Sequence, residues 1–132
     1  MLNESELWTE CRRSFAAGDY SEAWLLLQEF TCHYPRRADA HALAGQIAVM
    51  RRQWRQAVLA FRKAARAGRS TEAALMLPLA AAELQADMVT AAYQRLLDCQ
   101  PAADAEPVRF GEQDHAPLAW RDELLAAARE RL

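Results

Sequence analysis

A six-residue motif that recurs at a fixed period constrains this sequence more than any other feature. Residues 18–23 (Gly-Asp-Tyr-Ser-Glu-Ala) are matched by residues 52–57 (Arg-Gln-Trp-Arg-Gln-Ala) and by residues 86–91 (Ala-Asp-Met-Val-Thr-Ala), so the period is 34 residues. In each copy a large side chain is followed three residues later by alanine, as in the pairs Tyr20/Ala23, Trp54/Ala57 and Met88/Ala91. A unit of this length cannot bury its own apolar face, so at least three copies must stack against one another.

The spacing of apolar residues predicts two helices in each repeat. We expect helices over residues 4–17, 21–33, 38–51, 54–67, 72–85 and 88–99, and a last one over 117–131. Asn3 with Glu6 forms a capping box before the first helix, Gly68 is placed to end the fourth, and Pro117 suits the first turn of the last. Residues 100–116 contain proline, glycine and acids that break the helical period, which predicts a loop.

The period and its small and bulky positions resemble the tetratricopeptide repeat family. The positions that carry the resemblance in repeat one (4–37) are Leu7, Cys11, Ala23, Leu27, Phe30 and Pro35; in repeat two (38–71), His41, Ala44, Gly45, Ala57, Phe61 and Ala64; and in repeat three (72–105), Leu75, Leu79, Ala82 and Ala91. Repeat three then departs from the pattern, because Arg95 and Asp98 stand where an aromatic and a small residue belong. The resemblance implies a single all-α domain over residues 1–132: three helical hairpins stacked in a right-handed superhelix, a loop over 106–116 and a C-terminal capping helix.

Composition excludes several classes of function. The 132 residues include no apolar run long enough to span a bilayer, and the acidic start differs from a signal peptide, so we expect a cytoplasmic protein with no membrane insertion. Three cysteines without a C-x-x-C pair argue against a disulfide framework or a structural zinc site, and Cys11 is expected to be a buried structural thiol. The histidines lack metal-ligand spacing, and no phosphate-binding loop or nucleophile motif occurs. We therefore predict no catalytic residues, no metal, no cofactor and no enzyme activity.

The resemblance implies a concave groove lined by the first helix of each repeat. Its pattern places the client-binding residues at Trp8, Arg12, Phe15, Ala42, Gln46, Val49, Met50, Met76, Ala80 and Glu83. This surface is mostly apolar and suits an extended or helical apolar segment of a client protein. The alternative is that these side chains simply pack inside the superhelix or under the last helix. Pro78 inside the last of these helices either kinks it or is tolerated.

The same groove positions argue against one use of the family. Tetratricopeptide domains that hold the C-terminal carboxylate of heat-shock proteins place Lys, Asn and Lys or Arg at set positions. The corresponding residues here include Trp8, Leu43, Ala73 and Leu77, and Arg12 alone is cationic. A carboxylate would lack its ring of donors.

Charge is segregated along the chain although the net charge is only −2. Residues 36–71 carry eight Arg and one Lys against Asp39 alone, whereas both flanking segments are acidic. The helical spacing predicts a basic convex face formed by Arg55, Arg62, Lys63, Arg66 and Arg69. Three hypotheses remain for this face: a solvated surface, a site for an acidic protein, and a nucleic-acid site, which the absence of interleaved aromatic residues disfavours.

The function that the sequence favours is binding of another protein. Among small bacterial proteins of this design, the chain looks most like the tetratricopeptide chaperones of type III secretion, which implies a chaperone or adaptor that shields an apolar client segment. Under this hypothesis, replacing Trp8 or Met76 by alanine weakens client capture by about 1–3 kcal/mol each. The alternatives are an electrostatic adaptor that uses the basic face and a self-assembling subunit or homodimer.

Overall fold

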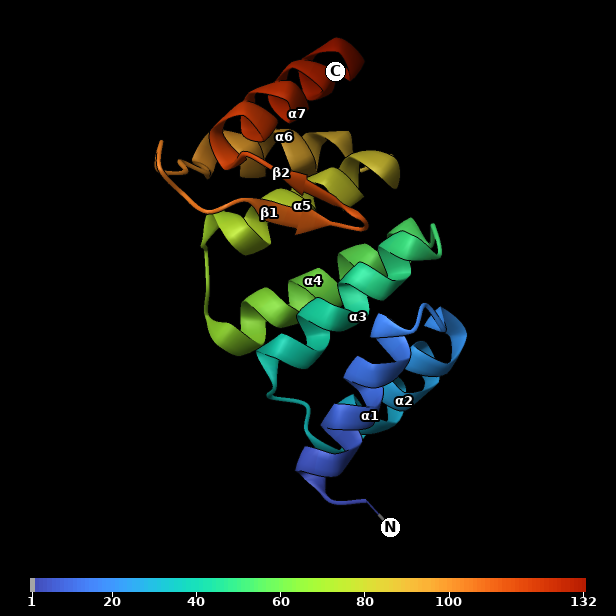
Figure 1. The fold of residues 1–132 in the computed structure, drawn as a ribbon. Helices are drawn as coiled ribbons and strands as arrows, with labels where there is room; N and C mark the ends of the chain where they lie inside the picture. Colours follow the sequence, from blue (N-terminus) through green and yellow to red (C-terminus); the bar gives the residue numbers. More distant parts are fainter. Residues whose placement is uncertain (1) are drawn as a thin grey trace.

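A computed structural model describes residues 2–132, which form seven helices and one short β-hairpin (Figure 1). The elements are α1 (Glu4–Ala16), α2 (Tyr20–His33), α3 (Ala38–Met50), α4 (Trp54–Gly68), α5 (Ala73–Gln85), α6 (Val89–Asp98), β1 (Val108–Phe110), β2 (Gln113–His115) and α7 (Pro117–Arg131). The seven expected helices are therefore confirmed, with ends that differ from expectation by at most one residue. The chain has the expected all-α architecture.

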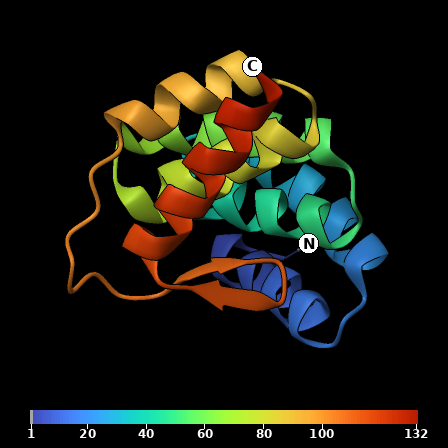
Figure 2. The ribbon, with the colours of Figure 1, turned by 90° about the horizontal axis from the view of Figure 1, so that it is seen from above.

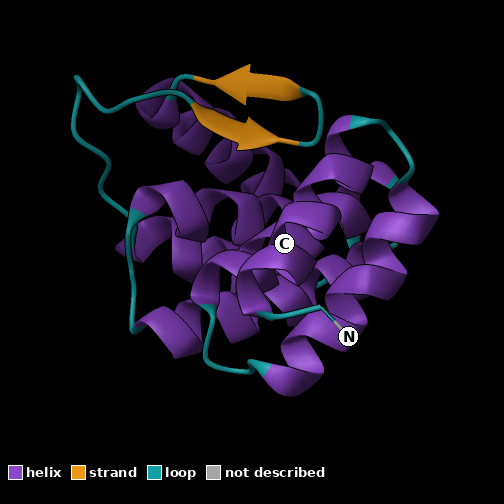
Figure 3. Cartoon of the chain, turned by 60° about the horizontal axis from the view of Figure 1, so that its bottom comes forward, coloured by secondary structure: helices purple, strands orange, loops and turns teal. Residues whose placement is uncertain are grey.

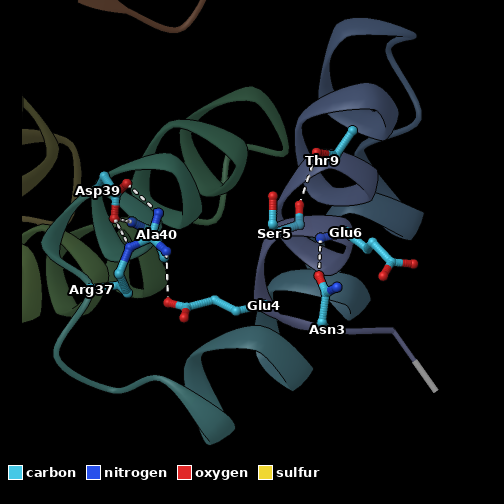
Figure 4. Close-up of polar contacts among 8 residues, drawn as sticks. All are labelled: Asn3, Glu4, Ser5, Glu6, Thr9, Arg37, Asp39 and Ala40. Carbon is cyan, nitrogen blue, oxygen red and sulfur yellow. Dashed lines mark hydrogen bonds and ion pairs between the residues drawn. The ribbon is translucent and has the colours of Figure 1, made fainter.

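Local sequence signals account for several helix ends. The Asn3 side chain accepts a hydrogen bond from the Glu6 N–H (2.9 Å), as expected for the start of α1 (Figure 4). Asp19 caps α2 in the same way by accepting from the Glu22 N–H (3.2 Å). Gly68 is the last residue of α4, as expected, but the left-handed conformation that terminates the helix is taken by Arg69 (φ 48°).

The helices associate in pairs that stack along the molecule. α1 packs on α2, α3 on α4 and α5 on α6, and successive pairs meet through α2 with α3 and α4 with α5 (Figure 1). Helices α3 and α4 approach closely at Gly45 and Phe61, because a Cβ added at Gly45 would lie 2.5 Å from the Phe61 ring. Only glycine fits there, so this position fixes how closely α3 and α4 approach each other.

The third repeat is displaced by one residue relative to the first two. The left-handed residues that follow α1 and α3 are Gly18 and Arg52, at the expected period, whereas the residue that follows α5 is Asp87. The helices move with it, because α1 and α3 begin at residues 4 and 38 but α5 begins at residue 73. The extra residue lies between α4 and α5, so the uninterrupted period assumed from the sequence is wrong for repeat three.

This shift restores the repeat pattern in α6. The alanine equivalent to Ala23 and Ala57 is Ala92, which is fully buried like them, and not Ala91. The large position is Leu96, also fully buried, and the small position near the helix end is the buried Cys99. The apparent departures at Arg95 and Asp98 are therefore a consequence of reading the repeat one residue out of register.

A β-hairpin forms within the segment 106–116 that was expected to be a loop, and this corrects that expectation. β1 and β2 are antiparallel, with Val108 opposite His115 and Phe110 opposite Gln113, so Gly111 and Glu112 make a two-residue turn. Gly111 has φ 65°, which glycine adopts without strain. The hairpin lies beside α5 on the side of the molecule formed by α1, α3 and α5 (Figure 2). Figure 3 shows its two strands along one side of the helices.

The last helix closes the stack. α7 packs against α5 and α6 and buries Trp120, Leu125 and Ala128, as expected for a capping helix. Arg131 near its end donates to the Leu84 carbonyl (2.7 Å) and pairs with Asp87. None of the described helices is long and apolar enough to cross a membrane.

Candidate binding groove

A pocket of about 480 Å³ lies on the face formed by α1, α3 and α5, and we call it the open pocket. Its walls are Trp8, Arg12, Phe15 and Ala16 from α1, Asp39, Ala42, Leu43 and Gln46 from α3, Phe61 from α4, and Ala74 and Leu75 from α5. The volume is within the range of pockets that hold small ligands or peptide side chains. Five of the ten sequence-predicted groove residues meet here, namely Trp8, Arg12, Phe15, Ala42 and Gln46.

One end of the open pocket is organised by Arg37, which precedes α3. Its guanidinium bonds Asp39 (2.9 and 2.7 Å) and Glu4 (2.9 Å), so it links α1 to α3 (Figure 4). The same group lies over the Trp8 ring, 5.1 Å from its centroid, and holds that wall of the pocket. The hydrogen bond from Arg37 lowers the pKa of Asp39, which keeps this carboxylate ionised and already paired.

Arg12 is the charged group of the open pocket that is available to a ligand. Arg12 is exposed, and none of the ion pairs found within residues 2–132 includes it. Pro78 has no N–H to bond the carbonyl of Ala74, four residues earlier, and Ala74 lines the pocket. Within the described residues, the pocket therefore offers one unpaired cation among mostly apolar walls.

The other half of the groove is covered by the hairpin. The Gln46 carboxamide donates to the Arg109 carbonyl (2.8 Å) and accepts from the Gly111 N–H (2.8 Å). It thus pairs with the main chain of β1 as a neighbouring strand would. A Cβ added at Gly111 would lie 3.3 Å from a Val49 methyl and 3.4 Å from the Met50 sulfur, so the turn sits directly on these two predicted groove residues.

Aromatic rings attach the hairpin to the helices. Phe110 lies parallel to Trp54 (centroids 6.3 Å apart) and tilted against Trp120 (5.5 Å). His115 of β2 stacks against Trp120 at 4.2 Å. These contacts connect α4, the hairpin and α7, so the cover is anchored at both ends.

The three predicted groove residues of repeat three do not face the groove. Met76, Ala80 and Glu83 are buried, and Glu83 is fully enclosed. The Glu83 carboxylate accepts from Arg95 (2.7 and 3.1 Å) and Arg62 (2.9 Å), and Arg95 also contacts the Met76 sulfur (3.8 Å), so both side chains face α4 and α6. The one-residue displacement explains the error, because each residue turns a helix by about 100°.

The corrected register places Leu77, Ala81 and Leu84 at the groove positions of α5. All three are buried in the core cluster that also contains Val108 of the hairpin and Trp120. Ala74, at the first groove position, is exposed and lines the open pocket. Sequence reasoning also missed Phe110 and Gly111, although alternating apolar residues before a glycine are a hairpin signal.

The basic face is only partly as expected. Arg55, Lys63, Arg66 and Arg69 are exposed, but Arg62 is half-buried and committed to Glu83. Arg62 is therefore a structural residue that ties α4 to α5, and the inclusion of Arg62 in a free basic surface is wrong.

Two of the three cysteines lie in the buried surroundings of structural thiols. All three cysteines are free, and Cys11 and Cys99 are buried while Cys32 is exposed. Burial raises the pKa of the Cys11 thiol to about 11 and also raises the pKa of Cys99, so neither is a reactive thiolate at neutral pH. Within residues 2–132, no three His, Cys, Asp or Glu side chains are grouped to hold a metal ion.

Comparisons with known proteins agree with this architecture. No family model and no curated protein matches the sequence. Among solved structures, the chain is similar to one described as the TPR2B domain of yeast Sti1 in a complex with pHsp70. The two share 13% sequence identity, with a TM-score of 0.69 over 98% of each chain.

The chain has a tetratricopeptide-repeat-like fold. At this identity the likeness concerns the fold alone, and the open pocket of the present protein is defined by its own residues. Arg12 is the single cation among the residues that line the open pocket.

Proposed function

We propose that this tetratricopeptide-like protein binds a short apolar segment of a client protein in the open pocket. The observation that carries the proposal is that one half of the groove already holds an extended segment of the chain itself. Gln46 bonds the main chain of β1 while its own side chain also lines the open pocket. The same face therefore combines main-chain recognition with an unfilled apolar pocket beside it.

The size of the open pocket limits the client to one or two inserted side chains. Trp8, Phe15 and Leu43 would contact an apolar side chain, and burial of one such side chain contributes about 1.5–3 kcal/mol. Arg12 would contact a carboxylate or carbonyl of the client at the rim. A segment that crossed the whole groove would have to displace the hairpin from Val49 and Met50.

Within this function, the resemblance noted in the sequence favours a small bacterial chaperone or adaptor of the type III secretion kind, acting in the cytoplasm. Such a protein would withhold an apolar segment from aggregation by stoichiometric binding and would need no catalytic residue. A homodimer or self-assembling subunit is the competing proposal for the same apolar surface. Light scattering separates the two, because a dimer doubles the mass in the absence of any client.

Site-specific photo-crosslinking tests the proposal. A photoreactive phenylalanine analogue at Leu43, in the open pocket, is compared with the same analogue at Leu25, which is 65% exposed on α2. The crosslinked client segment is then synthesised as a peptide and titrated against the purified protein. We expect crosslinks from position 43 and few from position 25.

A matched pair of substitutions makes the result decisive. Ala42→Glu places a charge and bulk in the open pocket, while Ala127→Glu makes the same change at an exposed position of α7. Ala42→Glu is expected to weaken peptide binding by at least about tenfold, or 1.4 kcal/mol, with no effect from Ala127→Glu. Equal affinity of both variants and the unmodified protein would remove the open pocket as the binding site.

Met76 was expected to contact the client, but its position in the structure gives it a role in stability instead. Because Met76 is buried against Arg95 and not in the groove, Met76→Ala is expected to lower stability without a specific effect on client affinity. Trp8→Ala affects both, since the Trp8 ring also packs on Phe30 at 5.3 Å.

A further inference from the structure

A second depression lies away from the open pocket, between α2 and α4, with α3 as its floor. It consists of a pocket of about 540 Å³ and a neighbouring one of about 170 Å³, and we call it the outer trough. The two parts are continuous because both are lined by Gln28, Thr31, His41 and Lys63. The His41 ring on the floor is fixed, since its Nε2–H donates to the Pro35 carbonyl at 2.8 Å.

The two ends of the outer trough differ in chemistry. The larger end is lined by Arg36, Lys63 and Arg66, which belong to the loop before α3 and to α4. The smaller end is lined by Trp24, Leu59 and Ala60, and Leu59 is 56% exposed. The larger end therefore carries three cations, whereas the smaller end shares Lys63 and adds the apolar side chains of Trp24 and Leu59 to several polar ones.

The cations of the outer trough differ from their neighbours in having no acidic partner. Arg37 and Arg62, each next in sequence to one of them, are both engaged by carboxylates. Within residues 2–132 no ion pair includes Arg36, Lys63 or Arg66, and no Asp or Glu lines either part of the trough. Like charges grouped in this way repel one another, and a bound anionic group relieves that repulsion.

We propose that the outer trough docks an acidic segment of a partner protein, with carboxylates at Arg36, Lys63 and Arg66 and an apolar side chain at Trp24 and Leu59. The partner is a protein and not a nucleic acid because the smaller end offers Trp24 and the exposed Leu59 to an apolar side chain. Apart from the buried His41 ring, Trp24 is the single aromatic side chain that lines the trough, and the guanidinium of Arg51 already lies over the Trp24 ring at 5.8 Å. No aromatic face is available beside the cations to stack a base.

This site goes beyond the proposed client pocket and uses different residues. The open pocket is lined from α1, α3, α4 and α5 by residues that the outer trough does not share. Two partners could therefore bind at once, one apolar segment in the open pocket and one acidic segment outside it. Such an arrangement is that of an adaptor.

The test uses fluorescence anisotropy with three labelled probes of similar length. The first probe is a peptide of about twelve residues with Glu in one half and Leu in the other, a length comparable with the 15-residue α4 that lines the trough. The second probe is the same peptide with Gln in place of Glu. The third probe is an oligothymidine. The unmodified protein is expected to bind the acidic peptide at least about tenfold more tightly than the Gln peptide or the oligothymidine. Added salt should weaken the binding.

Matched variants locate the binding. Lys63→Glu is compared with Arg55→Glu, which reverses the same charge at an exposed position of α4 outside the trough. Leu59→Ser is compared with Leu118→Ser, at another exposed leucine. Lys63→Glu should weaken binding of the acidic peptide at least about tenfold and Leu59→Ser about threefold, with little effect from either control.

Three results would overturn the proposal. The first is no binding of the acidic peptide at low salt, and the second is equal loss from Lys63→Glu and Arg55→Glu. The third is tighter binding of the oligothymidine, which would indicate a nucleic-acid surface. If Ala42→Glu abolishes binding of the acidic peptide and Lys63→Glu does not, the peptide binds in the open pocket and not in the outer trough. Failure of the outer trough is therefore distinguishable from failure of the proposed function.

Discussion

The buried carboxylate of Glu83 gives the sharpest prediction about stability. Glu83 is fully buried and accepts three hydrogen bonds from Arg62 and Arg95, at 2.7, 2.9 and 3.1 Å. It is therefore the junction through which α4, α5 and α6 are held together. Glu83→Gln keeps the shape of the side chain and removes only the charge.

The magnitude follows from the contacts that an amide at this position cannot make. The amide oxygen can still accept, but the amide nitrogen would face a guanidinium N–H, so one arginine loses its acceptor. Hydrogen bonds to a buried charge are worth about 1.5–3 kcal/mol each, and breaking a buried ion pair costs about 3–5 kcal/mol. Because the Arg62 and Arg95 side chains are 35% and 28% exposed and can turn to water, we expect a loss near the lower end, about 3 kcal/mol.

Urea unfolding followed by circular dichroism measures this loss, and Glu130→Gln on the exposed surface of α7 is the matched control. The control should change the free energy of unfolding by less than about 0.5 kcal/mol. Removing Arg95 as well, in Glu83→Gln/Arg95→Gln, should cost less than the sum of the single changes, since the two groups interact. A loss below about 1 kcal/mol for Glu83→Gln would refute the view that this ion-pair cluster joins the three helices.

Three further predictions concern the hairpin, Asp39 and the cysteines. Phe110→Ala removes the ring between Trp54 and Trp120, so the Gly111 amide should exchange with deuterium at least about tenfold faster while the helical amides stay protected; unchanged exchange would contradict the anchoring role of Phe110. Asp39→Asn should lower the free energy of unfolding by less than about 1 kcal/mol at neutral pH, because the Asp39 side chain is 53% exposed. Arg37 lowers the pKa of Asp39 in the folded protein, so the ion pair stabilises the fold above the ordinary pKa of aspartate, and this stabilisation is lost as the pH falls through the folded pKa. The acid unfolding curves of the variant and the unmodified protein should therefore converge at low pH. Alkylation near pH 8 followed by mass measurement should label Cys32 alone in the folded protein and all three cysteines in denaturant, and rapid labelling of Cys11 would contradict its burial.

The sequence was sufficient where burial follows a local pattern. In α4, apolar positions fall on one side and charged positions on the other, so the buried Ala57, Phe61 and Ala64 were identifiable as the inner face. The sequence also indicated a small residue at position 45, since two helices of a pair approach closely only where a side chain is small, but the structure alone shows that it must be glycine. The family pattern, and not a local one, placed Trp8, Arg12, Phe15, Ala42 and Gln46 on one face, and these residues line the open pocket.

Repeat three shows where that reasoning fails. α5 is apolar on every side, and residues 76–84 are all buried, so its sequence contains no periodicity to indicate which side faces the groove. A single extra residue before α5 therefore rotated the predicted positions by about 100° without leaving a sign in the pattern of α5 itself. The sign lay in α6, where Arg95 and Asp98 depart from the repeat pattern. Met76 and Glu83 were placed in the groove, and Leu77 and Leu84 occupy the positions intended for them.

The stack of helical pairs can be read from the amino-acid sequence alone, because a period of 34 residues and amphipathic helices are properties of neighbouring residues. How much of the groove is open depends instead on the three-dimensional packing. The cover is a hairpin of three-residue strands, and its main-chain partner Gln46 lies 65 residues from Gly111 in the sequence. A contact over that separation depends on how the helices pack, and no local pattern of residues specifies it.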